Sequence, residues 1–196
     1  MRTATLTRTT GETDIRLALN LDGAGTFTGA TGCGFLDHML TLFARHGRFD
    51  LTCTAKGDCW VDDHHLVEDV GIVLGRAFRT ALGEMRGVTR YGSFLLPMDE
   101  SLVLVAVDLS GRCHVNYDMT LPAQKVGTFD TELGEEFVRS LGRELGASLH
   151  IKQMAGGNTH HLLEAMFKGL ARALAQAVAI DPRFAEEIPS TKGTIV

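Results

Sequence analysis

The sequence predicts an α+β fold made by tandem duplication of one β-β-β-α-β-α unit, in which two mixed sheets enclose a layer of helices. The first observation is a short motif, His-His-x-x-Glu, at residues 64–68 and again at residues 160–164 of a 196-residue chain. The second is that residues 35–40 align with residues 133–138 at an offset of 98. The third is that strand-like and helix-like segments follow the same order in each half.

The first half contains the elements of one complete unit. Runs that carry Thr, Val or Leu, broken by Gly11 and by residues 22–23, indicate three short strands. Apolar residues at helical spacing predict a helix that ends at Gly47, and a longer helix follows the next strand, with Asp62 or Asp63 as its cap. The expected strands are residues 2–8, 14–21, 25–30 and 48–55, and the expected helices are residues 35–46 and 63–85.

The second half repeats this order. Its expected strands lie near residues 92–97, 101–109, 112–119 and 147–154, and its expected helices near residues 131–145 and 159–179. The last helix carries an apolar stripe that is typical of a core-facing side, and the tail at residues 188–193 reads as irregular. We expect residues 1–88 and 89–196 to be the halves of one compact unit, because no Pro-rich linker separates them.

The composition is that of an ordinary soluble globular protein, with 44% apolar and 22% charged residues. A net charge of −5 argues against nucleic acid as a partner, since phosphate backbones require a basic surface. The sequence has neither an apolar run of membrane-spanning length nor a signal-peptide core, so we expect no membrane partner and a cytoplasmic location. The four cysteines lack zinc-site spacing and are expected to be free thiols.

The doubled motif predicts transition-metal binding. Adjacent residues on a helix point about 100° apart, so the two histidines of one motif should serve different ions, while the glutamate can share a face with either. One copy alone would be a solvated pair or an acidic helix start, but two copies in register favour metal sites. The repeat alignment adds one residue from each preceding helix. The eight candidate ligands, four for each of two ions, are His38, His64, His65, Glu68, Glu136, His160, His161 and Glu164. Imidazole and carboxylate without thiolate suit Mn²⁺, Fe²⁺, Co²⁺ or Zn²⁺.

These residues resemble the imidazoleglycerol-phosphate dehydratase family over essentially the whole chain. The resemblance depends on segments that are specific together although each is weak alone. They are residues 11–13, 35–40, 62–69, 158–165, 167–168 and 190–193. The fold that the resemblance implies is a duplicated α+β unit of the ribosomal protein S5 domain 2-like type, in agreement with the repeat.

The resemblance implies a lyase of L-histidine biosynthesis. The reaction would dehydrate D-erythro-1-(imidazol-4-yl)glycerol 3-phosphate to 3-(imidazol-4-yl)-2-oxopropyl phosphate, at two Mn²⁺ ions that bind the imidazolate of the substrate. One ion would be held by His38, His65, Glu68 and His160, and the other by His64, Glu136, His161 and Glu164. At residue 136 many family members carry histidine, so the glutamate of this chain departs from the pattern.

The resemblance also implies the remaining site residues and the assembly. Glu12 would be the acid/base that handles protons; without the resemblance it would read as an ordinary turn carboxylate. His46 would line the substrate pocket. The residues expected to bind the phosphate are Arg90, Arg112, Ser190, Thr191 and Lys192. The family assembles as a large homo-oligomer, which implies 24 subunits with active sites at subunit contacts.

Two other functions are compatible with the motif. A dinuclear metallohydrolase would use a metal-bound hydroxide on an ester and should hydrolyse activated phosphate esters. A protein that stores or senses metal would bind the ions but would have no use for cations gathered around one anion. The dehydratase is distinguished from both by its need for an imidazole-containing phosphorylated substrate.

Overall fold

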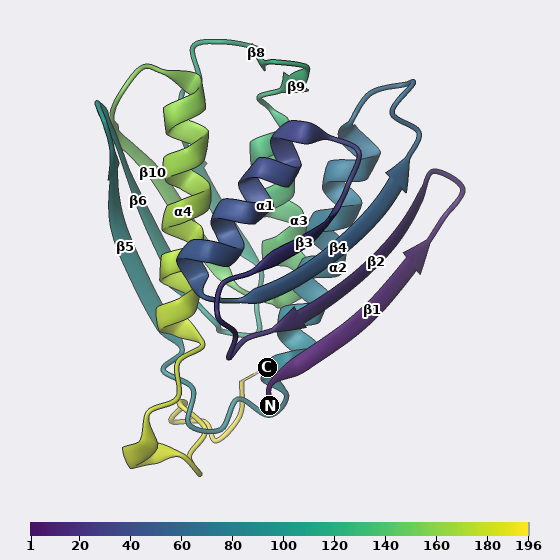
Figure 1. The fold of residues 1–196 in the computed structure, drawn as a ribbon. Coiled ribbons are helices and arrows are strands. Elements are labelled where there is room, and N and C mark those ends of the chain that lie inside the picture. Colours follow the sequence, from purple (N-terminus) through teal and green to yellow (C-terminus); the bar gives the residue numbers. More distant parts are fainter. Residues whose placement is uncertain (196) are drawn as a thin grey trace.

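The structure, a computed structural model that describes residues 1–195, contains two four-stranded sheets with helices between them (Figure 1). The first half comprises β1 (Thr3–Thr9), β2 (Thr13–Asn20), β3 (Phe27–Ala30), α1 (Gly34–Gly47), β4 (Asp50–Gly57) and α2 (His64–Leu82). Its sheet has the order β1-β2-β4-β3. The β2 strand is antiparallel to both neighbours and β3 is parallel to β4, so the sheet is mixed.

The second half has the same topology. It comprises β5 (Tyr91–Met98), β6 (Ser101–Asp108), β7 (His114–Asp118), β8 (Lys125–Val126), β9 (Phe129–Asp130), α3 (Leu133–Leu145), β10 (Ser148–Ala155), α4 (Thr159–Ala177) and the 3-10 turn η1 (Pro182–Phe184). The sheet order is β5-β6-β10-β7, with β10 antiparallel to β6 and parallel to β7. The predicted α+β fold with a duplicated β-β-β-α-β-α unit is therefore confirmed.

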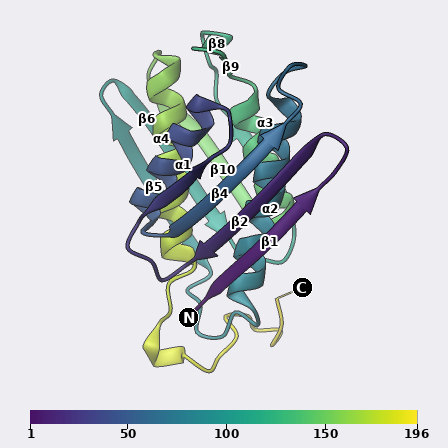
Figure 2. The same cartoon turned by 45° about the vertical axis from the view of Figure 1, so that its right-hand side comes forward.

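The helices form the layer between the sheets and pair across the two halves. The α2 helix covers the first sheet and α4 covers the second, while α2 packs on α3 and α1 packs on α4 (Figures 1 and 2). The α2–α3 contact is close because Gly71 and Gly75 face it. A Cβ atom on Gly75 would lie 2.6 Å from the carbonyl oxygen of Leu141, which is too close for any side chain. Glycine at this position thus lets the two helix backbones meet.

All four α-helices begin at the same end of the layer, at the top of Figure 1. The histidine motifs stand at the starts of α2 and α4, so the duplication places both at this end. Helix N-termini carry a partial positive charge, which favours carboxylates nearby. The C-terminal end of α4 and the tail lie at the opposite end of the molecule (Figure 2).

Two details differ from the predicted elements, and the expected cap of α2 is found. The β8–β9 hairpin was not expected, because its strands have two residues each and follow an irregular stretch. The α2 helix ends at Leu82 and not at residue 85. Asp63 is the N-cap residue of α2, and the side chain of Asp62 accepts the hydrogen bond from the backbone N–H of His64.

The four cysteines are free thiols, as predicted. Burial raises the pKa of the Cys33 thiol to about 11 and that of the Cys53 thiol to about 12, so both stay protonated at neutral pH. Within residues 1–195, no helix combines the length and the apolar character that crossing a bilayer would require.

Candidate active site

The first group of potential metal ligands lies between α1 and α4, and we call His38, His160 and Glu164 the α1–α4 cluster. The Nε2 atom of His38 lies 3.9 Å from Oε1 of Glu164, and Nε2 of His160 lies 3.7 Å from Oε2. Glu164 is largely buried, whereas both imidazoles are nearly half exposed. The cluster therefore presents two nitrogens and one anchored carboxylate at an accessible position.

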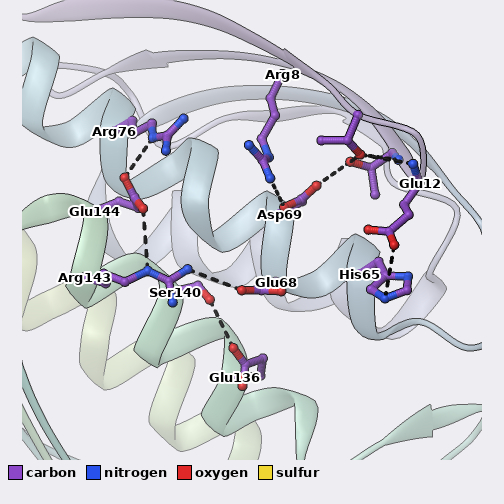
Figure 3. Close-up of polar contacts among 12 residues, drawn as sticks. Arg8, Glu12, His65, Glu68, Asp69, Arg76, Glu136, Ser140, Arg143 and Glu144 are labelled. Carbon is purple, nitrogen blue, oxygen red and sulfur yellow. Dashed lines mark hydrogen bonds and ion pairs between the residues drawn. The ribbon is translucent and has the colours of Figure 1, made fainter.

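The second group lies between α2 and α3, and we call His64, Glu68 and Glu136 the α2–α3 cluster. Ser140 donates a hydrogen bond of 3.3 Å to Glu136 Oε1, and Arg143 donates one of 3.3 Å to Glu68 Oε1 (Figure 3). His64 and Glu136 also line an open pocket of about 310 Å³. This cluster offers one nitrogen and two carboxylates.

Each cluster combines residues from both halves of the chain. His38 joins the second motif and Glu136 joins the first, because α1 packs on α4 and α2 packs on α3. Within each motif the first histidine and the glutamate share a cluster, as residues four apart on a helix do. His38 and Glu136, which the repeat alignment paired, therefore occupy equivalent positions, one beside each motif.

The structure groups the ligands differently from the two four-residue sets that the resemblance implies. Glu164 lies in the α1–α4 cluster and Glu68 in the α2–α3 cluster, so the two glutamates are exchanged relative to those sets. His65 and His161 belong to neither cluster within one chain. The implied sets remain a prediction for an assembly in which several chains contribute ligands.

We call His65 and His161 the outer histidines; each is held by a carboxylate at Nδ1. The Nδ1 atom of His65 donates to Asp58 at 3.0 Å, and that of His161 donates to Glu100 at 2.8 Å. These hydrogen bonds raise the pKa of both imidazoles above the usual value. The bond from His161 lowers the pKa of Glu100 to about 2. The Nε2 atom of each outer histidine is thereby left as the lone-pair nitrogen whenever the ring is neutral.

Glu12 lies in the turn between β1 and β2, at the side of α2. It is more than half exposed, and its Oε1 lies 3.8 Å from Nε2 of His65. The turn is fixed to α2 because Thr13 Oγ1 donates to the buried Asp69, whose other oxygen pairs with Arg8 at 2.9 Å (Figure 3). The α2 helix therefore positions both the α2–α3 cluster and the turn that carries Glu12.

Both clusters fit a divalent transition metal by their donor chemistry. Imidazole nitrogens and carboxylate oxygens lie within 4.8 Å of one another in each. Two ligands at about 2.1 Å from one ion are at most roughly 4.2 Å apart, so small side-chain rotations would close either set. The glutamate of each motif pairs with a cationic side chain. Arg143 lies 3.3 Å from Glu68, and Lys168 lies 2.8 Å from Glu164. These cations hold the carboxylates in place.

A pocket of about 190 Å³ lies where the C-terminal tail meets the second sheet, and we call it the tail pocket. Its lining includes all five residues expected to bind phosphate, from three separate segments: Arg90, Arg112, Ser190, Thr191 and Lys192. Arg90 has structural contacts of its own, because it pairs with Asp108 at 2.7 Å and donates a hydrogen bond to the Pro189 carbonyl at 2.9 Å. Among residues 1–195, Arg112 and Lys192 form no ion pair with a carboxylate, so they leave the pocket cationic.

The tail pocket and the two clusters lie at opposite ends of the molecule. The backbone N–H of Arg90 donates to the carbonyl of Ala177, the last residue of α4, whereas His160 is the second residue of that helix. At 1.5 Å per residue, these points on α4 are about 25 Å apart. A ligand that extends under about 10 Å cannot contact both within one chain.

His46, expected beside the substrate, lies near the C-terminal end of α1 and does not line the tail pocket. Its pKa is lowered, first by burial and then by the positive charge of Lys168. Residues that sequence reasoning missed are Asp58, Glu100 and Asp69, which hold the outer histidines and the Glu12 turn. Extending the repeat alignment to the strands would have found Glu100, because it immediately precedes β6 as Glu12 immediately precedes β2.

Known proteins resemble this chain over nearly its full length. A relative from Lachnoclostridium phytofermentans, named imidazoleglycerol-phosphate dehydratase, is 58% identical over 99% of this chain and 98% of its own. A relative of the same name from Desulforamulus reducens is 56% identical over the same shares. The crystal structure of the Staphylococcus aureus enzyme matches 91% of this chain and 99% of its own, with a TM-score of 0.83 and 40% identity. IGPD from Pyrococcus furiosus, in complex with (S)-C348, matches 96% and 99%, with a TM-score of 0.84 and 42% identity.

Fold and site together define a class of duplicated α+β proteins with paired histidine–carboxylate clusters at one end of a helical layer. The sequence model of the imidazoleglycerol-phosphate dehydratase family matches residues 31–174, which include both motifs. The chain belongs to the imidazoleglycerol-phosphate dehydratase family and is a dehydratase.

Proposed function

We propose that the protein dehydrates D-erythro-1-(imidazol-4-yl)glycerol 3-phosphate to 3-(imidazol-4-yl)-2-oxopropyl phosphate in cytoplasmic histidine biosynthesis. The observation that carries the proposal is the tail pocket. Five residues that the family resemblance assigned to the substrate phosphate come from three distant segments and line one cationic pocket. A protein that only stores or senses metal has no need of such a pocket.

The two clusters and the outer histidines are proposed to hold two Mn²⁺ ions. When bound, these ions supply Lewis acidity and a template for the imidazole ring. The carboxylates of Glu164 and Glu68 are held in place by ion pairs with Lys168 and Arg143, respectively. Arg112 and Lys192 bind the phosphate, with the hydroxyls of Ser190 and Thr191 as further donors. Each group acts at a different part of the same small substrate.

Glu12 is the proposed acid/base. The reaction removes a carbon-bound hydrogen and a hydroxyl group from neighbouring carbons, so a side chain must accept one proton and a proton must reach the departing oxygen. Glu12 is exposed and stands on a turn held by α2 beside an outer histidine. Its carboxylate can therefore reach a substrate that is bound at the motif end of the molecule.

We further propose that copies of the chain complete one another's active sites in a homo-oligomer. The separation of about 25 Å along α4 prevents one substrate from reaching the clusters and the tail pocket of the same chain. A second copy that brings its tail pocket to the motif end of the first would remove this conflict. Symmetric assembly would then build the same site repeatedly. The expected 24-subunit particle is one such assembly.

The direct test is incubation of the Mn²⁺-loaded protein with imidazoleglycerol phosphate while the ketone product is followed. We expect product from the loaded protein, and none after chelation until Mn²⁺ is restored. Absence of product from folded, Mn²⁺-replete protein would refute the proposed reaction. Release of inorganic phosphate, together with hydrolysis of p-nitrophenyl phosphate, would instead support the metallohydrolase.

A further inference from the structure

The two halves carry equivalent glutamates in equivalent turns. Glu12 immediately precedes Thr13 at the start of β2, and Glu100 immediately precedes Ser101 at the start of β6. In each half this turn follows the first strand and lies beside the outer histidine of the same half. The duplication therefore supplies one such glutamate per half; in the second half the neighbouring Asp99 also lies 3.7 Å from Nε2 of His161.

The two glutamates have different surroundings. The Glu12 carboxylate lies 3.8 Å from Nε2 of His65 and is mostly exposed. In Glu100, Oε1 accepts hydrogen bonds of 3.0 Å from the backbone N–H of Asn158 and from the hydroxyl of Ser101. Its Oε2 accepts a bond of 2.8 Å from Nδ1 of His161. Both oxygens of Glu100 are thus occupied by donors, whereas Glu12 is free to contact a ligand.

The surroundings of Glu12 and Glu100 differ because of the residue that directly follows the fourth strand of each half. In the first half Asp58 follows β4 and holds Nδ1 of His65. The matching residue of the second half, directly after β10, is Gly156. Its φ is +111°, and a Cβ atom there would lie 2.4 Å from Ser101 Oγ and 2.7 Å from Ser101 Cα. No side chain fits at this position, so residue 156 cannot hold His161 as Asp58 holds His65.

We infer that Glu100 is the positioning residue of His161, performing for the second half the task that Asp58 performs for the first, and that Glu12 alone remains as the proton-transferring glutamate. The Nδ1–H bond to Glu100 fixes the ring and its tautomer, so that Nε2 is the nitrogen available to a metal ion. The same glutamate fastens the start of α4 through Asn158. This inference depends on the proposed function, since it takes His161 as a metal ligand.

Glu100→Gln tests the inference with a readout that does not require turnover. A glutamine has one accepting oxygen and cannot satisfy donors on both of its termini, so His161 or Asn158 loses its partner. We expect Mn²⁺ affinity, measured by titration calorimetry on the metal-free protein, to fall by about 10- to 100-fold. Glu84→Gln is the matched control, because Glu84 makes the same chemical change at an exposed position beyond the end of α2, where its carboxylate pairs with Arg86 and belongs to neither cluster.

Three outcomes are distinguishable. Weaker Mn²⁺ binding in Glu100→Gln alone supports the inference. Unchanged Mn²⁺ affinity, with turnover lost as in a Glu12 variant, would make Glu100 a second acid/base and overturn it, as would a variant equal to wild type in both properties. If Glu100→Gln does not fold, Glu100→Asp keeps the charge on a shorter arm and should weaken Mn²⁺ binding for the same reason. Failure of the proposed function itself would appear separately, as a wild-type protein that gives no ketone.

Discussion

Replacing Glu12 with glutamine is expected to abolish most turnover while the Mn²⁺ content stays at the wild-type level. The change preserves the shape of the side chain but removes its ability to accept a proton. Loss of a general acid or base typically costs about 10²- to 10⁴-fold in rate. The turn should remain in place, because it is fixed by Thr13 and Asp69 and not by Glu12. Steady-state turnover and metal analysis of the same preparation provide the two measurements.

The control for this variant is again Glu84→Gln, in which the same substitution is made at an exposed residue beyond the end of α2. We expect that control to retain wild-type turnover. A Glu12→Gln protein that turns over at the wild-type rate would remove Glu12 from the mechanism. A protein that loses both activity and metal would show that Glu12 supports the metal site and does not only transfer protons.

Replacing His64 with alanine is expected to lower the metal content and to abolish turnover. His64 supplies the only nitrogen of the α2–α3 cluster, in which its partners are the carboxylates Glu68 and Glu136. Without His64 the cluster itself contributes only carboxylate oxygens, which suit Mg²⁺ or Ca²⁺ better than a transition metal. We therefore expect one bound Mn²⁺ per chain where the wild type binds two, as measured by elemental analysis after dialysis.

His114→Ala is the matched control for this histidine variant. His114 lies on β7 and belongs to neither cluster; its ring centroid lies 5.5 Å from that of His150, with the planes tilted by 43°. The control should bind two ions and remain active. Retention of two Mn²⁺ per chain in His64→Ala would contradict the assignment of the α2–α3 cluster as a metal site.

The fold could be predicted because the same structural unit occurs twice in the sequence, so that the element order of each half supports that of the other. The offset of 98 between the halves places β4 on β10 in the structure as it did in the sequence. Both sheets then share one strand order, which neither half would establish alone. The β8–β9 hairpin escaped prediction because it belongs to an insertion that has no counterpart in the first half and whose strands are too short to show alternation.

The sequence supplied the candidate ligands but could not predict which of them lie together. Helical spacing allows Glu68 to face either His64 or His65, and the sequence cannot choose between them. The choice depends on Asp58, which holds His65 at Nδ1 and leaves His64 beside Glu68. A contact across seven residues through a loop has no periodic signature, so only the folded chain reveals it.

The separation of the tail pocket from the clusters is the other property that sequence reasoning could not supply. Residues of the two regions are interleaved along the chain: Arg90 and Arg112 precede the second motif, and Lys192 follows it. Their positions depend on the direction of α4, which carries the chain from the motif end to the tail end. This direction supports the proposal that one active site is built from more than one copy of the chain.

Co-production of two inactive variants in one cell tests whether copies of the chain share an active site. His64→Ala damages the motif end, and the double variant Arg112→Ala/Lys192→Ala damages the tail pocket. If each site takes its motif end and its tail pocket from different copies, random mixing leaves roughly one quarter of the sites intact. We predict that the co-produced protein regains up to about that share of wild-type turnover, whereas each variant alone stays inactive. Co-assembled protein no more active than its parents would contradict a site shared between chains.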